Sequence, residues 1–138
     1  MQSINLASLA IGSELPSFTT QPISRLTLAL YCGASGDHNP IHVDVDFARK
    51  AGMPDVFAHG MLSMGYLGRL LTNWVRQEAI RDFSVRFVSI TQVGDAITCA
   101  GKVVEIDEVG GTLRLEVTTR NQAGEIKLSG EAVIALNA

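Results

Sequence analysis

The 138-residue sequence has few cysteines, no excess of basic residues and no long unbroken hydrophobic run. Its two cysteines, Cys32 and Cys99, lack the CxxC spacing of a zinc or redox site and are too few for a disulfide scaffold. We therefore expect reduced thiols and a cytoplasmic protein. Eleven Lys and Arg stand against 14 Asp and Glu, a net charge of -3, which excludes the basic field that nucleic-acid binding needs.

Membrane attachment is not predicted either. The first 18 residues have no positively charged start and their apolar residues are interrupted, so we expect neither a signal peptide nor an anchor. The most apolar stretch, residues 56–75, contains His59, Arg69 and Asn73. These polar side chains favour a helix buried in protein over a helix in lipid.

The composition predicts one globular domain over residues 1–138. Hydrophobic residues make up 46% of the chain and charged residues 18%, which is typical of a folded soluble protein. A chain of this size buries roughly two-thirds of its unfolded surface, so it can build a core without disulfides or metals. No repeat, low-complexity run or linker divides it.

The sequence before the first glycine-rich stretch predicts a short strand and a helix. Residues 17–21 alternate weakly between apolar and polar side chains, which indicates a short strand. Ser24 is a candidate N-cap for a helix that ends at the glycines 33 and 36. The spacing of Leu26, Leu28 and Leu30 leaves a strand open as an alternative there.

Two further helices are predicted before residue 80. Asp44 caps a short one, in which we expect Phe47 and Ala48 to face inward. Residues 58–77 then form a helix that is apolar nearly all round. About 20 residues at 1.5 Å each give about 30 Å, the width of a small domain, so this helix should run through the centre with protein on most sides.

After residue 80 the apolar residues recur at every second position, which predicts strands. In residues 112–120, Leu113, Leu115 and Val117 point to one face and the residues between them to the other. Four such strands are separated by turn sequences, over residues 83–90, 95–106, 112–120 and 126–136. The expected fold class is α+β, an antiparallel sheet wrapped around the long helix.

The chemically capable side chains fall in two places. One is a loop rich in turn formers; the other is the start of the long helix, at His59 and Gly60. A tight turn there could bring a carboxylate and an imidazole to one water molecule. The first N–H groups of a helix lack internal partners and can stabilise a carbonyl oxygen that gains negative charge. The loop carries Asp37, His38, Asn39, Pro40 and His42.

These two segments resemble a known motif. SGDHNPIHVDVDFA, residues 35–48, followed by AHGMLSMG, residues 58–65, is similar to the hydratase motif of the MaoC-like, R-specific enoyl-CoA hydratase family. FSVRFVSITQVGDAIT, residues 83–98, is similar to the family's strand-turn-strand segment. The chain also resembles the small (3R)-hydroxyacyl-ACP dehydratase subunits. The resemblance implies a hot-dog fold, with five or six antiparallel strands around one long helix.

The resemblance also implies roles for single residues. It makes Asp37 and His42 the catalytic pair that activates water, and the Gly60 backbone N–H the donor to the thioester oxygen. Asn39 would order the loop and His59 would shape the start of the helix. Acyl-chain contacts are expected further along the helix, near Gly68 and Leu71. The implied reaction is reversible hydration of a trans-2-enoyl thioester to the (R)-3-hydroxyacyl thioester, a lyase reaction without metal or redox cofactor.

Other interpretations of the same residues remain open. Asp37 is a common turn residue, and His42 could be a half-buried histidine bonded to backbone. Asp37, His42 and His59 could ligate iron or zinc, but their spacing fits no common closed site, so we expect no metal. A hot-dog thioesterase is one competing function. A non-catalytic or partner-dependent acyl-thioester binding subunit is the other.

The expected partners are an acyl-CoA or acyl-carrier-protein thioester and a second polypeptide. A sheet of five or six strands around one helix has open edges, and a second copy would cover them. The resemblance implies a homodimer or higher homo-oligomer, with a heterodimer as the alternative. The acyl-chain length and the carrier are not specified by the sequence.

Overall fold

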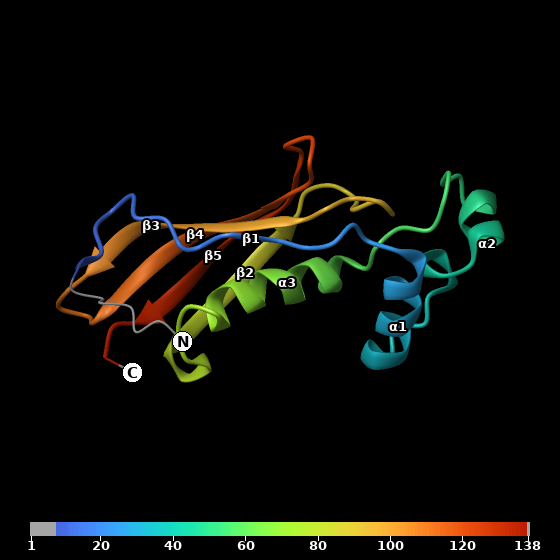
Figure 1. Cartoon of the computed structure of the whole chain (residues 1–138). Coiled ribbons are helices and arrows are strands. Elements are labelled where there is room, and N and C mark those ends of the chain that lie inside the picture. Colours follow the sequence, from blue (N-terminus) through green and yellow to red (C-terminus); the bar gives the residue numbers. More distant parts are fainter. Residues whose placement is uncertain (1–7, 138) are drawn as a thin grey trace.

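The computed structural model describes residues 8–137, in which an antiparallel sheet covers one long helix (Figure 1). The strands are β1 (Phe18–Thr19), β2 (Ile80–Phe87), β3 (Thr98–Asp107), β4 (Thr112–Arg120) and β5 (Ile126–Ala135). They lie in the order β1-β3-β4-β5-β2, so β1 and β2 form the two edges. The helices are α1 (Arg25–Ser35), η2 (Pro40–His42), α2 (Val45–Lys50), α3 (Gly60–Thr72) and η3 (Gln77–Ala79). This is the expected hot-dog architecture.

The inner strands β3 and β4 bury one side, as the alternating pattern predicts. In β4, Leu113, Leu115 and Val117 are at most 1% exposed, and Arg114 and Glu116 between them are exposed. The buried side chains meet those of α3, among them Leu67 and Leu70. Burial of these apolar surfaces against each other holds the sheet and the helix together.

The central helix is shorter than the predicted 58–77. It begins at Gly60 and ends at Thr72, so its 13 residues span about 20 Å. The chain then turns, because the N–H groups of Trp74 and Val75 both bond to Leu71 O, and Trp74 enters the core. Most of α3 is buried or half-buried as expected, but a stripe that includes Met61, Gly65 and Arg69 is exposed in the single chain.

The early elements largely follow the sequence pattern. Residues 25–35 are helical and not extended, and Ser24 Oγ accepts the Thr27 N–H at 3.0 Å as the predicted N-cap. Asp44 caps α2 in the same way. In α2, Ala48 is buried as expected, but the inward position expected for Phe47 was wrong: its side chain is 43% exposed. A six-residue helix at the end of the molecule has room for one buried position.

Residues 24–57, which we call the outer segment, carry α1, η2 and α2 beyond one end of the sheet (Figure 1). Both ends of this segment meet the loop formed by residues 88–95. Ile23 exchanges backbone hydrogen bonds with Gly94 and Asp95, of 2.7 and 2.9 Å, just before the segment starts. The Ala58 N–H donates to Thr91 O at 2.9 Å just after it ends. Within residues 8–137 no helix has the length and apolar content to cross a bilayer.

Gly130 is required where β5 approaches β2. A Cβ built at this position would lie 2.0 Å from Ser84 O and 2.8 Å from Val85 Cα. Both atoms are backbone, so the neighbouring strand has to move to accept a side chain. The register pairs Gly130 with Val85 on β2 and with Val117 on β4, in the middle of the sheet.

We expect Gly130→Ala to lower the free energy of unfolding by about 1–3 kcal/mol, because the extra methyl group overpacks two strands. Gly33→Ala is the matched control, since a Cβ at this α1 position meets nothing within 4 Å. Alanine favours a helix over glycine by up to about 1 kcal/mol, so the control should be neutral or stabilised. Urea unfolding measures both; equal stability of the two variants would contradict the close approach at Gly130.

Candidate active site

The loop between α1 and α2 is held by its own side chains. Gly36 ends α1 with a φ of 76°, a conformation that favours glycine. Asp37 Oδ1 then accepts the Asn39 N–H at 3.2 Å, and Asn39 Oδ1 accepts the Ile41 N–H at 3.1 Å. Such turns by Asp and Asn side chains shape the backbone locally. The expected ordering role of Asn39 has a direct geometric basis in the second bond.

The turn brings Asp37 and His42 together. His42 Nε2 lies 4.0 Å from Asp37 Oδ2. The Asp37 side chain is 52% exposed and that of His42 only 11%, so the carboxylate is open to solvent and the imidazole lies mostly inside the protein. Because the Phe57 carbonyl can only accept, the 2.7 Å contact with His42 Nδ1 places the proton on Nδ1. In the neutral form of the ring, the free lone pair is then on Nε2, which faces the carboxylate.

His59 lies beneath this pair and is buried. Its ring stacks on His42, with centroids 3.8 Å apart and planes 24° apart, and Tyr31 packs edge-on against it. His59 Nε2 lies 3.3 Å from Asp37 O, a pure acceptor, and 3.3 Å from Cys32 Sγ. His59 Nδ1 is buried without a hydrogen-bond partner among the described residues. His59 occupies the N-cap position of α3 but makes no side-chain capping bond.

Burial sets the protonation of these inner groups. Desolvation, and after it the neighbouring His42, lowers the pKa of His59 below its ordinary value of 6.5. Desolvation, and after it Asp37, raises the pKa of the Cys32 thiol. A neutral imidazole and a neutral thiol therefore lie behind the Asp37 and His42 pair at neutral pH.

Gly60 is the first residue of α3, so its N–H has no acceptor within the helix. A Cβ at this position would lie 2.7 Å from two atoms of the Phe87 ring, which rests against the glycine. A pocket of about 360 Å³ opens beside Gly60. Its walls are Phe57, Ala58, Gly60, Phe87, Val88, Ser89, Ile90, Thr91 and Leu128.

The structure brings some of the predicted site residues together and leaves others apart. Asp37, His42 and His59 offer polar atoms within 4.8 Å of one another. Gly68 and Leu71 lie on α3 about 12 and 16 Å beyond Gly60, measured at 1.5 Å per residue. Leu71 is fully buried in the core. These two residues are therefore not part of the polar cluster.

Three parts of the site were not predicted from the sequence. The Phe57 carbonyl fixes the His42 tautomer, Phe87 covers Gly60, and Cys32 contacts His59. A backbone acceptor has no residue signature, and the other two contacts depend on how distant elements pack. Only the four-residue step from Leu28 to Cys32 indicates that the thiol shares the buried face of α1.

Asp37, His42 and His59 are also the residues that could hold a metal ion. The lone pairs of an imidazole lie in the plane of its ring. Because the two histidine rings are stacked at 24°, their lone pairs run side by side and do not converge on one point. This arrangement is poor for shared coordination.

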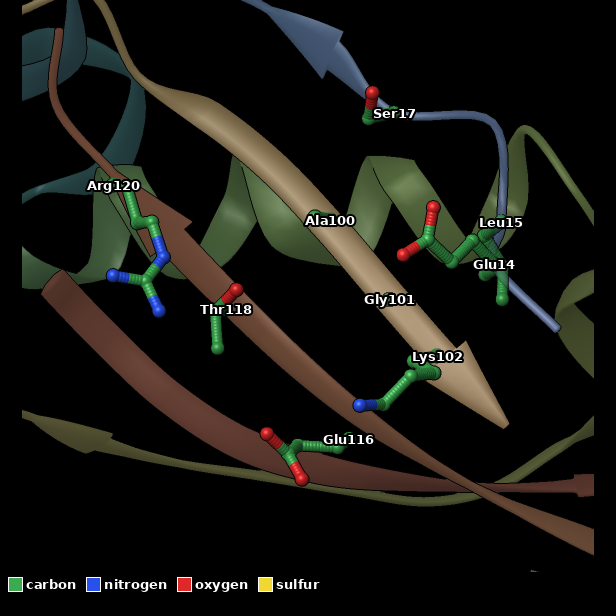
Figure 2. A pocket seen from close by; sticks show the side chains of 9 residues that line it. All are labelled: Glu14, Leu15, Ser17, Ala100, Gly101, Lys102, Glu116, Thr118 and Arg120. Atoms are coloured by element: carbon green, nitrogen blue, oxygen red, sulfur yellow. The ribbon is translucent and has the colours of Figure 1, made fainter. Parts of the chain in front are cut away.

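A second hollow lies on the face of the sheet that points away from α3 (Figure 2). It is polar and carries both signs of charge, with Lys102 and Arg120 beside Glu14 and Glu116. Lys102 and Glu116 are direct register partners on β3 and β4. None of the clustered residues of the loop or of the α3 start lines it.

Comparison with known proteins gives the family. The model of the MaoC like domain matches residues 8–125, and the chain belongs to this family. An (R)-specific enoyl-CoA hydratase from Rhodospirillum rubrum is 32% identical over 120 residues, covering 84% of this chain and 81% of that protein. The structure of an (R)-hydratase from A. caviae superposes with a TM-score of 0.81 at 26% identity, covering 94% of this chain and 98% of the other.

A much larger protein contains a similar region. The fatty acid synthase subunit beta of Saccharomyces cerevisiae is 29% identical over 136 residues. These residues are 96% of this chain but only 6% of that subunit. The chain therefore corresponds to a small part of the synthase subunit.

The buried His59 makes the stability of the fold depend on pH. Its pKa is lower in the folded chain than in the unfolded one, so the unfolded chain binds the proton more readily. The contribution of the neutral His59 ring to the free energy of unfolding is fully present above pH 6.5. It is lost as the pH falls toward the pKa of His59 in the folded chain. We expect the thermal midpoint to decrease as the pH is lowered from about 7 to about 5. We expect His59→Gln to make the midpoint depend less steeply on pH.

His38→Gln is the control for this titration, because His38 is exposed in the same loop. It should keep the wild-type slope. Calorimetry of the three proteins over this range measures the effect; an unchanged slope in His59→Gln would show that another group is responsible.

Proposed function

We propose that this chain hydrates trans-2-enoyl thioesters reversibly to (R)-3-hydroxyacyl thioesters. The observation that carries the proposal is the 4.0 Å approach of Asp37 Oδ2 to His42 Nε2 beside the free N-terminus of α3. A base, a carboxylate and a backbone donor are the groups that addition of water next to a thioester requires. The R-specific hydratase relative and the (R)-hydratase structure support the reaction class.

The geometry supports the following sequence of events. A water molecule held by Asp37 gives a proton to His42 Nε2 while its oxygen bonds to C3 of the enoyl group. The electron pair of the C2–C3 double bond moves toward the thioester oxygen, and the Gly60 N–H stabilises the negative charge there. The Asp37 and His42 pair then delivers a proton to C2. The reverse sequence removes water.

Hydration changes no oxidation state overall, so the proposal needs no redox cofactor, and Asp37 and His42 supply the acid-base chemistry without a metal ion. CoA or acyl carrier protein serves as the carrier of the substrate. We place the acyl chain along α3 toward Gly68 and not at Leu71, which is fully buried in the core. Gly68 has no side chain, and Phe83 Cε1 lies 3.6 Å from the position of its missing Cβ.

Replacing either member of the pair should nearly abolish hydration. We expect Asp37→Asn and His42→Ala to lower kcat about 10²- to 10⁴-fold, the usual contribution of general acid-base catalysis, while the circular dichroism spectrum stays unchanged. Loss of the conjugated enoyl absorbance of a trans-2-enoyl-CoA measures the rate.

His38→Ala is the matched control, an exposed histidine of the same loop, and should keep the wild-type rate. Near-normal rates in both pair variants would refute the assignment. Thiol release from saturated acyl-CoA by the wild type would favour the thioesterase alternative. Ligand binding without turnover until a companion chain is added would favour the partner-dependent subunit.

We propose that a second copy of the chain covers the β2 edge. β2 and β1 are the edges of the sheet, and an open edge is exposed to pairing with other chains. The end of β2 and the residues after it expose Phe87, Val88 and Ile90, at 42% or more each. Phe87 also rests on Gly60, so the same surface continues into the candidate site.

A dimer of this kind should have twice the 14.8 kDa of the chain in light scattering. We expect Val88→Glu to shift it toward the monomer, because the substitution places a charge on the covered edge. Val109→Glu, at a fully exposed position of the turn between β3 and β4, should leave the mass unchanged. A dimeric Val88→Glu variant would place the interface elsewhere.

A further inference from the structure

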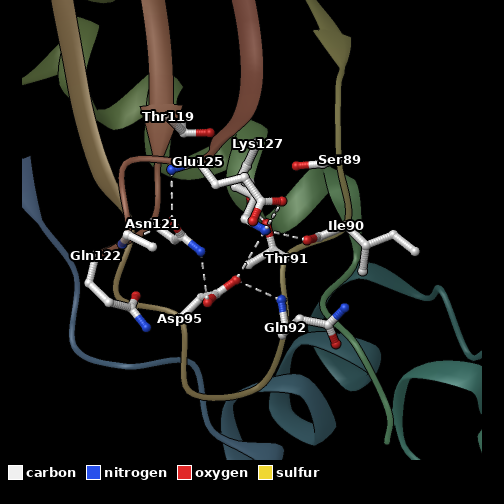
Figure 3. Close-up of polar contacts among 12 residues, drawn as sticks. Ser89, Ile90, Thr91, Gln92, Asp95, Thr119, Asn121, Gln122, Glu125 and Lys127 are labelled. Atoms are coloured by element: carbon white, nitrogen blue, oxygen red, sulfur yellow. Dashed lines mark hydrogen bonds and ion pairs between the residues drawn. The ribbon is translucent and has the colours of Figure 1, made fainter. Parts of the chain in front are cut away.

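Lys127 is a buried charge that takes no part in the site described above. Its side chain, on β5, is only 2% exposed. The ammonium donates to Ile90 O at 2.7 Å and to Glu125 Oε1 at 2.9 Å, and Asp95 Oδ2 lies 3.5 Å away (Figure 3). Burying a lysine is costly, and these three acceptors offset the cost.

The acceptors connect Lys127 to the whole loop of residues 88–95. Asp95 Oδ2 also accepts the Gln92 N–H at 2.9 Å, and Asp95 Oδ1 accepts from Asn121 Nδ2 at 3.3 Å (Figure 3). The Val88 N–H donates to Lys127 O at 2.9 Å. The ammonium therefore lies at the point where β5 and both halves of this loop meet.

The same loop holds Phe57 and Ala58, which precede His59, the N-cap residue of α3. Phe57 pairs with Gln92 in an antiparallel bridge, and the Ala58 N–H donates to Thr91 O. The Phe57 carbonyl is the acceptor that fixes the His42 tautomer. Gly60, whose N–H faces the thioester oxygen in the proposed reaction, follows two residues after Ala58.

We propose that Lys127 is a positioning residue for the candidate site. Its ammonium fixes the loop of residues 88–95, and the loop fixes the Phe57 carbonyl and the Ala58 amide. Through these two backbone groups it sets the orientation of His42 and the start of α3. The link itself follows from the contacts; its effect on turnover rests on the proposed function.

Lys127→Met tests the link, since it keeps much of the side-chain length and removes the charge. We expect kcat to fall about tenfold or more with KM within about twofold, because small misplacements of reacting groups are costly to the chemical step. We also expect the Ala58 amide to exchange with solvent at least about tenfold faster, and amides of the central strand β4 to keep their rates.

Lys127→Met leaves the buried Asp95 without its cation, so the variant can lose stability for that reason alone. Lys127→Met combined with Asp95→Asn removes both charges. In this double variant we expect the thermal midpoint to recover toward wild type while kcat stays low, because Ile90 O still lacks its donor. Lys102→Met, an exposed lysine on β3, is the control and should match wild type in every measurement.

The outcomes separate the two proposals. If the wild type hydrates enoyl thioesters and the stabilised double variant has the same kcat as the wild type, the positioning role is overturned. An unchanged exchange rate of the Ala58 amide in both variants would overturn it as well. A wild-type protein that hydrates no enoyl thioester would refute the proposed function, and the Ala58 exchange would still decide the structural link.

Discussion

The site depends on one small backbone contact. It consists of the antiparallel bridge between Phe57 and Gln92 and the hydrogen bond from the Ala58 N–H to Thr91 O. The outer segment leaves the sheet before α1 and returns to it here. Without this contact the Phe57 carbonyl would have no fixed position, and neither would the tautomer of His42. The orientation of His42 therefore depends on a backbone contact between the outer segment and the loop of residues 88–95.

Within the site, charge and burial are divided between two sides. Asp37 is open to solvent, whereas His42 is held against the stacked ring of His59. The lowered pKa of His59 keeps that ring neutral, so His59 places no positive charge beside His42. A base that accepts a proton during a reaction benefits from a neighbour that does not compete for it.

Much of this arrangement could be predicted from the sequence, and the reasons differ between elements. The strands and the Ser24 and Asp44 caps follow from periodicity and local hydrogen bonding, which act over a few residues. The approach of Asp37 to His42 was expected from a motif resemblance. The end of α3 at Thr72, the exposure of Phe47 and the buried Lys127 could not be predicted, because each depends on which surface a distant element covers.

The arrangement of the outer segment has a consequence for cooperativity. This segment lies beyond the end of the sheet and its two ends meet one loop, whereas the strands share long ladders of hydrogen bonds. Such a region can open as a unit at a lower free energy than global unfolding. The aligned site can then be lost before the sheet, while the protein is still mostly folded.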